Sequence, residues 1–98
     1  MDVRFRDDDY RRLECDATFT AGMAAALVRA YRNRLNYIRQ AQDQRDLYAW
    51  KSLRFEKLKG DRNHQHSLRL NDRWRLIIEL DGEAPNKTVV IVEIKDYH

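Results

Sequence analysis

Four cations in the second half of the sequence fall on consecutive predicted strands or on the turn between them: Lys59, Arg62, Arg69 and Arg75. Antiparallel strands can bring such side chains within reach of one phosphate group. The run Asp96-Tyr97-His98, which follows an apolar strand, adds groups that can carry protons. Cleavage of an RNA strand needs a base for the 2′-hydroxyl proton, an acid for the leaving 5′-oxygen and positive charge beside the phosphorane. These residue types therefore suit phosphodiester chemistry.

The same residues also have a purely structural interpretation. On a solvated face of a sheet, Arg75 would pair with Asp96, and Lys59 would pair with Glu56. Burial of these groups in one concave face would favour catalysis over such a network of ion pairs. Spacing alone leaves both interpretations open.

Other chemistries have less support in the sequence. His64 and His66 can present two imidazoles on one side of a strand, with His98 as a third metal ligand, but such pairs in a turn are more often solvent-exposed. The only cysteine, Cys15, lies between two acidic residues, whose charges disfavour the thiolate. The three glycines of the chain cannot build a phosphate-cradling loop. We expect neither a metal ion nor a cofactor.

Length and composition predict one small, charged domain covering residues 1–98. Lysine and arginine total 19 against 16 acidic residues, which gives a net charge of +3. Arginine supplies 14 of these cations, and its planar fork suits phosphate, although a solvated charged face explains this composition equally well. No window of 18 apolar residues and no apolar N-terminal run is present. We therefore expect a soluble cytoplasmic protein with no membrane contact.

The first half of the chain is predicted to be helical. Residues 3–5 form a short strand or the entry to a helix, and Asp7-Asp8-Asp9 offers N-cap and first-turn carboxylates for a helix through residue 13. Thr18 and Thr20 are possible N-caps of a second helix that runs to about residue 41. The buried stripe of this helix is Met23, Leu27, Tyr31, Leu35 and Ile38. Residues 43–50 are predicted to be a polar connector with a few apolar anchors.

The second half is predicted to be a meander of antiparallel strands at residues 55–59, 66–70, 73–80 and 88–94. A turn at residues 60–63 follows the first strand, and Asn71-Asp72 makes a tight two-residue turn after the second. Within the second strand, Ser67 and Arg69 share the face opposite the apolar residues. The last strand is apolar on both faces, as a central strand would be. The fold class is α+β, with two N-terminal helices packed on one face of a small antiparallel sheet.

Three blocks of this half resemble HigB-type toxins, the plasmid maintenance system killer branch of the RelE/ParE superfamily. The blocks are FEKLKGDR at residues 55–62, HSLRLNDRWR at residues 66–75 and VEIKDYH at residues 92–98. They occur in the order and at the separation found in these toxins. The resemblance implies a RelE-like fold and a ribosome-dependent endoribonuclease that cleaves mRNA in the ribosomal A site and so inhibits translation.

The resemblance also implies catalytic roles for individual residues. Asp96, Tyr97 and His98 match the terminal motif of the family, with His98 as the first choice for proton transfer. Its own α-carboxylate should favour the imidazolium form, which suits a general acid and leaves the role of the base to Glu56, Tyr97 or Asp96. Arg75 matches the arginine that stabilises the phosphate. Glu56 stands where some members have a catalytic histidine, and it either acts as the base or pairs with a cation.

The remaining cations of the first two matched blocks are expected to bind RNA. These are Lys57, Lys59, Arg62, Arg69 and Arg73. His66 lies in the same block as Arg69 and is less clearly catalytic.

The resemblance implies partners as well. They are a cognate antitoxin of the HigA kind, the ribosome with its mRNA, and operator DNA reached only through the antitoxin complex. The alternatives are a ParE-like poison of DNA gyrase, which shares the fold, and a non-catalytic basic binding module. The small net charge favours dependence on the ribosome, because few phosphate contacts give little affinity for free RNA.

Overall fold

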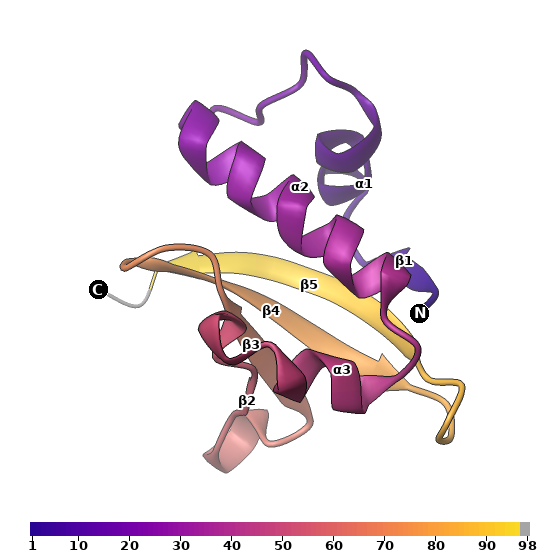
Figure 1. Ribbon diagram of the computed structural model, residues 1–98. Coiled ribbons are helices and arrows are strands. Elements are labelled where there is room, and N and C mark those ends of the chain that lie inside the picture. The colour runs from indigo at the N-terminus through magenta and orange to yellow at the C-terminus, as the bar shows by residue number, and fades with distance from the viewer. Residues whose placement is uncertain (97–98) are drawn as a thin grey trace.

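A five-stranded sheet forms one layer of the molecule, and helices cover one of its faces (Figure 1). The computed structural model describes residues 1–96. Its helices are α1 (Asp8–Cys15), α2 (Ala25–Gln40) and α3 (Gln44–Ala49), with short 3₁₀ turns η1 (Lys51–Leu53) and η2 (Gly60–Arg62). Its strands are β1 (Val3–Phe5), β2 (Glu56–Lys57), β3 (Gln65–Arg69), β4 (Trp74–Asp81) and β5 (Thr88–Asp96). The α+β class predicted from the sequence is confirmed.

The strand order is β1-β5-β4-β3-β2, so β5 is an interior strand, paired on both sides as its apolar sequence predicted. The four strands from β2 to β5 form the predicted antiparallel meander. The expectation of a purely antiparallel sheet is wrong, because β1 pairs parallel with β5. Residues 3–5 therefore form a strand and not a helix entry. Three residues carry too little pattern to indicate which strand they join.

Helix α2 supplies most of the helical contribution to the core. It buries Leu27, Val28, Tyr31, Leu35 and Ile38, four of which belong to the predicted stripe. These side chains pack with Leu13 of α1 and Leu47 of α3 against the apolar face of the sheet. One layer of helices on one face leaves the other sheet face open to carry polar side chains.

The start of α2 differs from the prediction. Its N-cap is Ala24, with no side-chain hydrogen bond, and neither Thr18 nor Thr20 caps it. Thr18 instead donates its hydroxyl and its backbone N–H to Asp16, and the chain turns through Ala21 and Gly22, both at positive φ. Two consecutive left-handed residues cannot continue a right-handed helix, so the helix begins after them.

Two other segments also differ from their predictions. The connector at residues 43–50 contains helix α3, capped by Asp43, whose side chain accepts from the N–H of Arg45. Only Leu47 of this helix is buried, and a single anchor gives no periodicity to detect. Strand β2 is two residues long instead of the predicted five.

The connection between β3 and β4 is wider than the predicted two-residue turn. The Leu70 N–H donates to the Trp74 carbonyl, which leaves Asn71, Asp72 and Arg73 in the turn. The Asn71 side-chain oxygen accepts from the N–H groups of Arg73 and Trp74 at 2.9 and 2.8 Å. This Asx-type bonding fixes the turn with no left-handed residue.

A bulge between β4 and β5 changes which side chains of β5 face the helices. Ile77 is opposite Glu93, whereas Ile78 is opposite Ile91, so Val92 is the extra residue. Beyond the bulge Lys95 pairs with Arg75 on the open face, and Asp96 pairs with Trp74. Bulges commonly redirect side chains in this way near functional surfaces. In the described part of the chain, no helix is long and apolar enough to cross a membrane.

Candidate functional site: an arginine groove on the open sheet face

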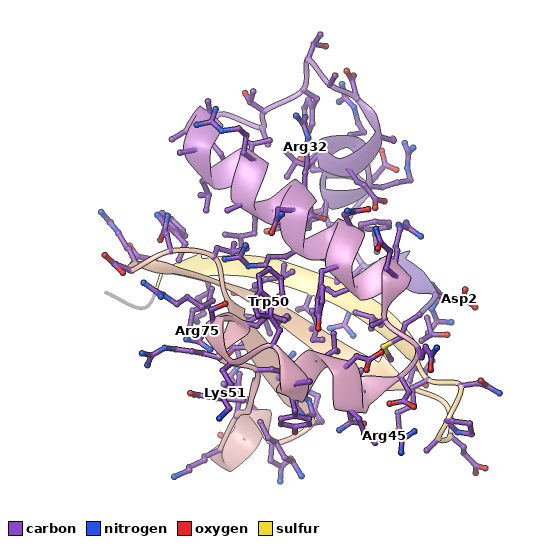
Figure 2. The ribbon with its side chains drawn as sticks, in the orientation of Figure 1. Asp2, Arg32, Arg45, Trp50, Lys51 and Arg75 are labelled. Carbon is purple, nitrogen blue, oxygen red and sulfur yellow. The ribbon has the colours of Figure 1, made fainter. Side chains whose placement is uncertain are left out.

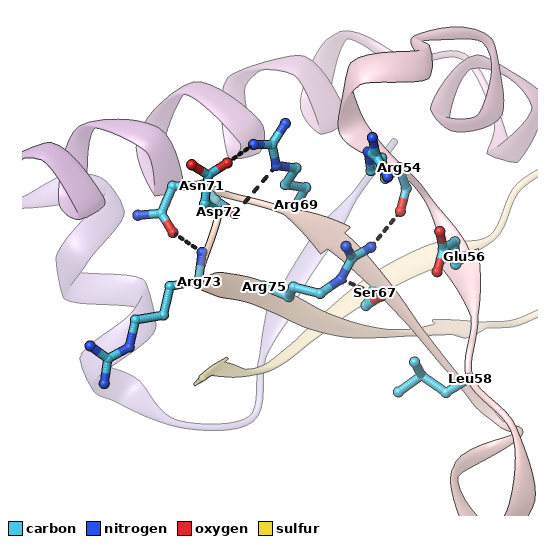
Figure 3. A pocket seen from close by; sticks show the side chains of 9 residues that line it. All are labelled: Arg54, Glu56, Leu58, Ser67, Arg69, Asn71, Asp72, Arg73 and Arg75. Carbon is cyan, nitrogen blue, oxygen red and sulfur yellow. Dashed lines mark hydrogen bonds and ion pairs between the residues drawn. The ribbon is translucent and has the colours of Figure 1, made fainter. Parts of the chain in front are cut away.

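A groove of about 480 Å³ lies at the β3–β4 hairpin, on the sheet face away from the helices (Figure 3). Residues that line it come from β2 and the chain on either side of it, from β3, from the turn and from β4: Arg54, Glu56, Leu58, Ser67, Arg69, Asn71, Asp72, Arg73 and Arg75. We call it the arginine groove. Strand alternation explains its composition, because Glu56 is opposite Ser67 and Arg69 is opposite Arg75 in the ladder. Four arginines against two carboxylates make the groove a cationic concave surface.

Arg75 is held from two directions inside the groove. Its Nε donates to the Ser67 hydroxyl at 2.9 Å, and its Nη2 donates to the backbone carbonyl of Arg54 at 2.5 Å. Both bonds are drawn in Figure 3. Two bonds in different directions restrict the rotation of the guanidinium, so that this arginine presents a defined geometry to an anion.

Two other arginines of the groove are paired with carboxylates. Arg69 forms an ion pair with Asp72 across the turn, and its Nε also donates to the Asn71 carbonyl at 3.3 Å. Arg73 donates from Nε to Asp96 at 2.8 Å, and this hydrogen bond raises the pKa of the guanidinium. Asp96, the last residue of β5, therefore contacts the groove through Arg73.

A fifth arginine supports the groove from the helical layer. Arg34 of α2 donates from Nε to the Arg69 carbonyl at 2.9 Å and from Nη2 to the Leu70 carbonyl at 3.4 Å. Burial, and then the charge of Arg69, lower its pKa. Arg34 therefore ties α2 to the end of β3, which sets the position of the hairpin relative to the helices.

The structure gathers only part of the predicted cation set in this groove. Arg69, Arg73 and Arg75 line it, whereas Lys57, Lys59 and Arg62 are not among the described residues that do. Lys57 is opposite His66 in the ladder, so it projects to the other side of the sheet from Glu56. Lys59 precedes η2 and is exposed.

Arg62 lies farther along the open face, outside the arginine groove. It donates to Gln65 at 2.8 Å and lies 3.7 Å from a carboxylate oxygen of Glu93. Gln65 in turn donates to Glu79 at 2.9 Å, and Arg6 of the chain beyond β1 bonds the same carboxylate at 2.5 Å. These contacts fasten η2 and the N-terminal strand to the sheet.

His66 lies on the helix side of β3 and takes no part in the groove. It is buried, and its ring stacks on Phe55 at 4.7 Å with an interplanar angle of 7°. Its Nδ1 has no hydrogen-bond partner in the described structure. Burial, with the charges of Lys57 and Lys87, lowers its pKa, so the imidazole is neutral at pH 7. The geometry makes His66 part of the aromatic packing beneath α3.

Of the predicted catalytic residues, the structure places Glu56 and Arg75 in the groove, whereas Asp96 is bonded to the groove arginine Arg73 and is not among the described residues that line the groove. Tyr97 and His98 lie outside the described residues. The interpretation of these residues as a network of ion pairs predicted a pair between Arg75 and Asp96. In the structure the Asp96 carboxylate accepts a hydrogen bond from Arg73.

Sequence reasoning missed several residues that line the groove. Arg54, Ser67, Asn71 and Asp72 line it, although none of them was singled out as a site residue. The alternation of β3 already put Ser67 on the face of Arg69, which is a signal that could have found it. No comparable signal exists for Arg54, which adopts a left-handed conformation (φ 48°, ψ 53°) without being glycine or asparagine.

Across residues 1–96, no three His, Cys, Asp or Glu side chains come together as the ligands of a metal ion would. Cys15 is exposed on α1, where the Arg11 guanidinium lies 3.5 Å from its sulfur.

Comparison with known proteins gives the class of the chain. Residues 3–98 match a family described as the RelE-like toxin of type II toxin-antitoxin system HigB. The chain is therefore a toxin of a type II toxin-antitoxin system, with a RelE-like fold. It belongs to the HigB-like toxin family, as the resemblance of its sequence blocks indicated. No curated protein matches the chain.

Solved structures agree on the fold. A YoeB/ParE toxin from Agrobacterium tumefaciens superposes with a TM-score of 0.59 at 15% identity, covering 100% of both chains. A YoeB dimer from Staphylococcus aureus gives a TM-score of 0.52 at 18% identity, covering 100% of this chain and 97% of the other. At this level of identity the likeness concerns the fold.

Proposed function

We propose that this toxin is a ribosome-dependent endoribonuclease that cleaves mRNA in the ribosomal A site. The observation that carries the proposal is the arginine groove, where Arg75 is fixed by two hydrogen bonds beside Glu56 on a concave cationic surface. Membership of a RelE-like toxin family supports an RNA-cleaving activity.

In the proposed reaction the 2′-oxygen of the substrate attacks the adjacent phosphorus, and the bond to the 5′-oxygen breaks. Arg75 stabilises the charge that develops on the phosphorane, because a fixed guanidinium needs no reorganisation when the charge appears. Glu56, which lines the same groove, takes the 2′-hydroxyl proton. Tyr97 and His98 are assigned on the family resemblance, with His98 protonating the leaving 5′-oxygen. Arg54, Arg69 and Arg73 position the RNA backbone.

Two properties of the chain support dependence on the ribosome. The net charge is only +3, and two of the four groove arginines are already paired with carboxylates, so few phosphate contacts remain for free RNA. Among the described residues that line the groove none is aromatic, so it offers no stacking platform for bases. The ribosome would then supply most of the positioning of the substrate.

The partners follow from the same proposal. Membership of a type II toxin family implies an antitoxin. We propose that it is a HigA-type protein, that operator DNA is contacted only through the complex of the two, and that the toxin acts on ribosomes in the cytoplasm.

The proposal is tested with purified toxin and one RNA, presented free or under translation. We expect efficient cleavage only of the translated RNA, and a loss of about a hundredfold to a thousandfold for Arg75→Ala. The matched control is Arg11→Ala, which removes an exposed arginine of α1 and should cleave like the wild type. Equal cleavage of free and translated RNA would exclude dependence on the ribosome.

Variants at the C-terminus test the remaining roles. Removal of His98 alone should abolish cleavage while binding to the antitoxin persists, and unchanged cleavage would exclude the role given to His98. Induction of the SOS response without loss of mRNA would instead indicate a gyrase poison. A non-catalytic binding module would either lose its protein partner when Arg75 or His98 is changed or be unaffected.

A further inference from the structure

The orientation of the Arg75 side chain depends on the groups that surround it. It is directly opposite Arg69 in the β3–β4 ladder and opposite Lys95 in the β4–β5 ladder, so like charges flank it on both sides. Like charges directly opposite in a sheet repel each other. A long side chain in this position would turn toward solvent unless acceptors hold it.

Ser67 provides the first acceptor from a rigid position. It is 1% exposed, and in the ladder it lies between Glu56 of β2 and Ile77 of β4. Its hydroxyl accepts from the Nε of Arg75 at 2.9 Å. Because Nε lies at the base of the guanidinium, this bond sets the plane of the fork relative to the sheet.

The second acceptor is the peptide carbonyl of Arg54. Arg54 ends the 3₁₀ turn η1 in a left-handed conformation that residues with a β-carbon rarely adopt. The buried side chains of Leu53 and Phe55 anchor the chain on either side, at 0% and 6% exposure. The Arg54 N–H also donates to the Lys51 carbonyl at 3.1 Å. The turn thereby directs the Arg54 carbonyl onto Nη2 of Arg75 at 2.5 Å, as Figure 3 shows.

We propose that Ser67 and the left-handed backbone of Arg54 are positioning residues that fix the guanidinium of Arg75 for the scissile phosphate. The inference rests on the proposed function and deepens it, since it assigns the precision of the site to two residues outside the proton-transfer set. Their contribution is to prevent small displacements of a charge that has to meet the phosphorane. Ser67 acts through Arg75 and does not itself contact the substrate.

A double-mutant cycle on translated mRNA tests the role of Ser67. Ser67→Ala should lower the single-turnover rate by about tenfold to a hundredfold, with KM for programmed ribosomes changed by less than about threefold. Ser67→Thr keeps the hydroxyl on a residue that favours strands and should retain the rate within about threefold. In an Arg75→Ala background, Ser67→Ala should have no further effect. An equal loss in both backgrounds, or an equal loss for Ser67→Thr, would overturn the proposal.

A matched pair of variants at Arg54 leaves β3 untouched. Arg54→Gly and Arg54→Val both remove the guanidinium, but only glycine adopts positive φ freely. We expect Arg54→Val to be at least about tenfold slower than Arg54→Gly, because a β-branched residue resists the left-handed backbone that aims the carbonyl. Equal rates for the two variants would overturn the role of this backbone.

A readout without catalysis separates this inference from the proposed function. The Nε–H resonance of Arg75 in nitrogen-15 NMR spectra should exchange slowly with water in the wild type, Ser67→Thr and Arg54→Gly. It should exchange fast in Ser67→Ala. If the wild type shows slow exchange but does not cleave translated mRNA, the proposed function is contradicted, whereas the positioning of the Arg75 guanidinium is supported. Fast exchange in the wild type would contradict the positioning itself.

Discussion

Replacing Asp72 by asparagine should strengthen the binding of RNA to the arginine groove. Asp72 is 95% exposed at the tip of the β3–β4 turn and forms an ion pair with Arg69. In the free toxin this carboxylate occupies a guanidinium that an RNA phosphate would otherwise contact. Asparagine keeps the size and the turn preference of aspartate, so the hairpin should be unchanged.

The size of the effect can be worked out from counterion release. For single strands, each phosphate contact changes the logarithm of the binding constant by about −0.7 per logarithmic unit of salt. One additional contact therefore strengthens binding at 0.15 M salt by about fourfold and makes the salt dependence steeper by about 0.7. An exposed ion pair is worth about 0.2–1 kcal/mol, so removing its competition with the phosphate can strengthen RNA binding by up to about fivefold. This limit is consistent with the fourfold gain from counterion release.

The assay is fluorescence anisotropy with a short unstructured RNA, deoxy-substituted to prevent cleavage, at several salt concentrations. The matched control is Asp8→Asn, because Asp8 pairs with Arg11 three residues away on α1, outside the groove. Both variants raise the net charge by one. Only Asp72→Asn should show the fourfold gain and the steeper slope. An equal gain for Asp8→Asn would show that overall charge is responsible, and weaker binding by Asp72→Asn would refute the competition between carboxylate and phosphate.

Two further predictions concern the scaffold. Tyr31 is fully buried and its hydroxyl donates to the Tyr10 carbonyl at 2.8 Å. Tyr31→Phe should therefore lower the free energy of unfolding, measured in urea, by about 1–2 kcal/mol. The control is Tyr48→Phe at a half-exposed tyrosine, which should change it little, and equal losses for the two variants would contradict the prediction. The hydrogen bond from Arg6, followed by that from Gln65, holds the pKa of Glu79 below its ordinary value. Because the pKa of Glu79 is lower in the folded than in the unfolded state, its ionised carboxylate stabilises the fold at pH values above the ordinary pKa. This contribution is lost as the pH falls through the pKa of the folded state. The temperature of thermal unfolding of Glu79→Gln should therefore vary less with pH than that of the wild type below about pH 5. Identical pH profiles would contradict the link.

Much of the sheet could be predicted because its strands alternate regularly. The alternation of β4 put Trp74, Leu76, Ile78 and Leu80 on one face, and all four contact the core. The apolar β5 is an interior strand between β1 and β4, as its composition indicated. A strand at residues 3–5 was one of two alternatives, but its pairing could not be predicted, since three residues do not encode a parallel partner at the other end of the chain.

The groove was only half predictable, for two physical reasons. Period-two alternation separates Glu56 from Lys57, so two predicted site residues that are adjacent in the sequence face opposite sides of the sheet. The left-handed backbone at Arg54 and the β-bulge at Val92 are set by tertiary packing. Neither position carries a glycine or a typical turn residue that would have indicated it in the sequence. Arg54 could therefore not be identified from the sequence as a site residue.

The most direct test of the central claim is to map mRNA 5′ ends in cells after induced expression of the toxin. One reporter mRNA should be present in two forms, one with and one without a ribosome-binding site. We expect new 5′ ends within the reading frame of the translated form only, and none for Arg75→Ala. Cuts at the same positions in the untranslated form, or growth arrest with both mRNAs intact, would contradict ribosome-dependent cleavage.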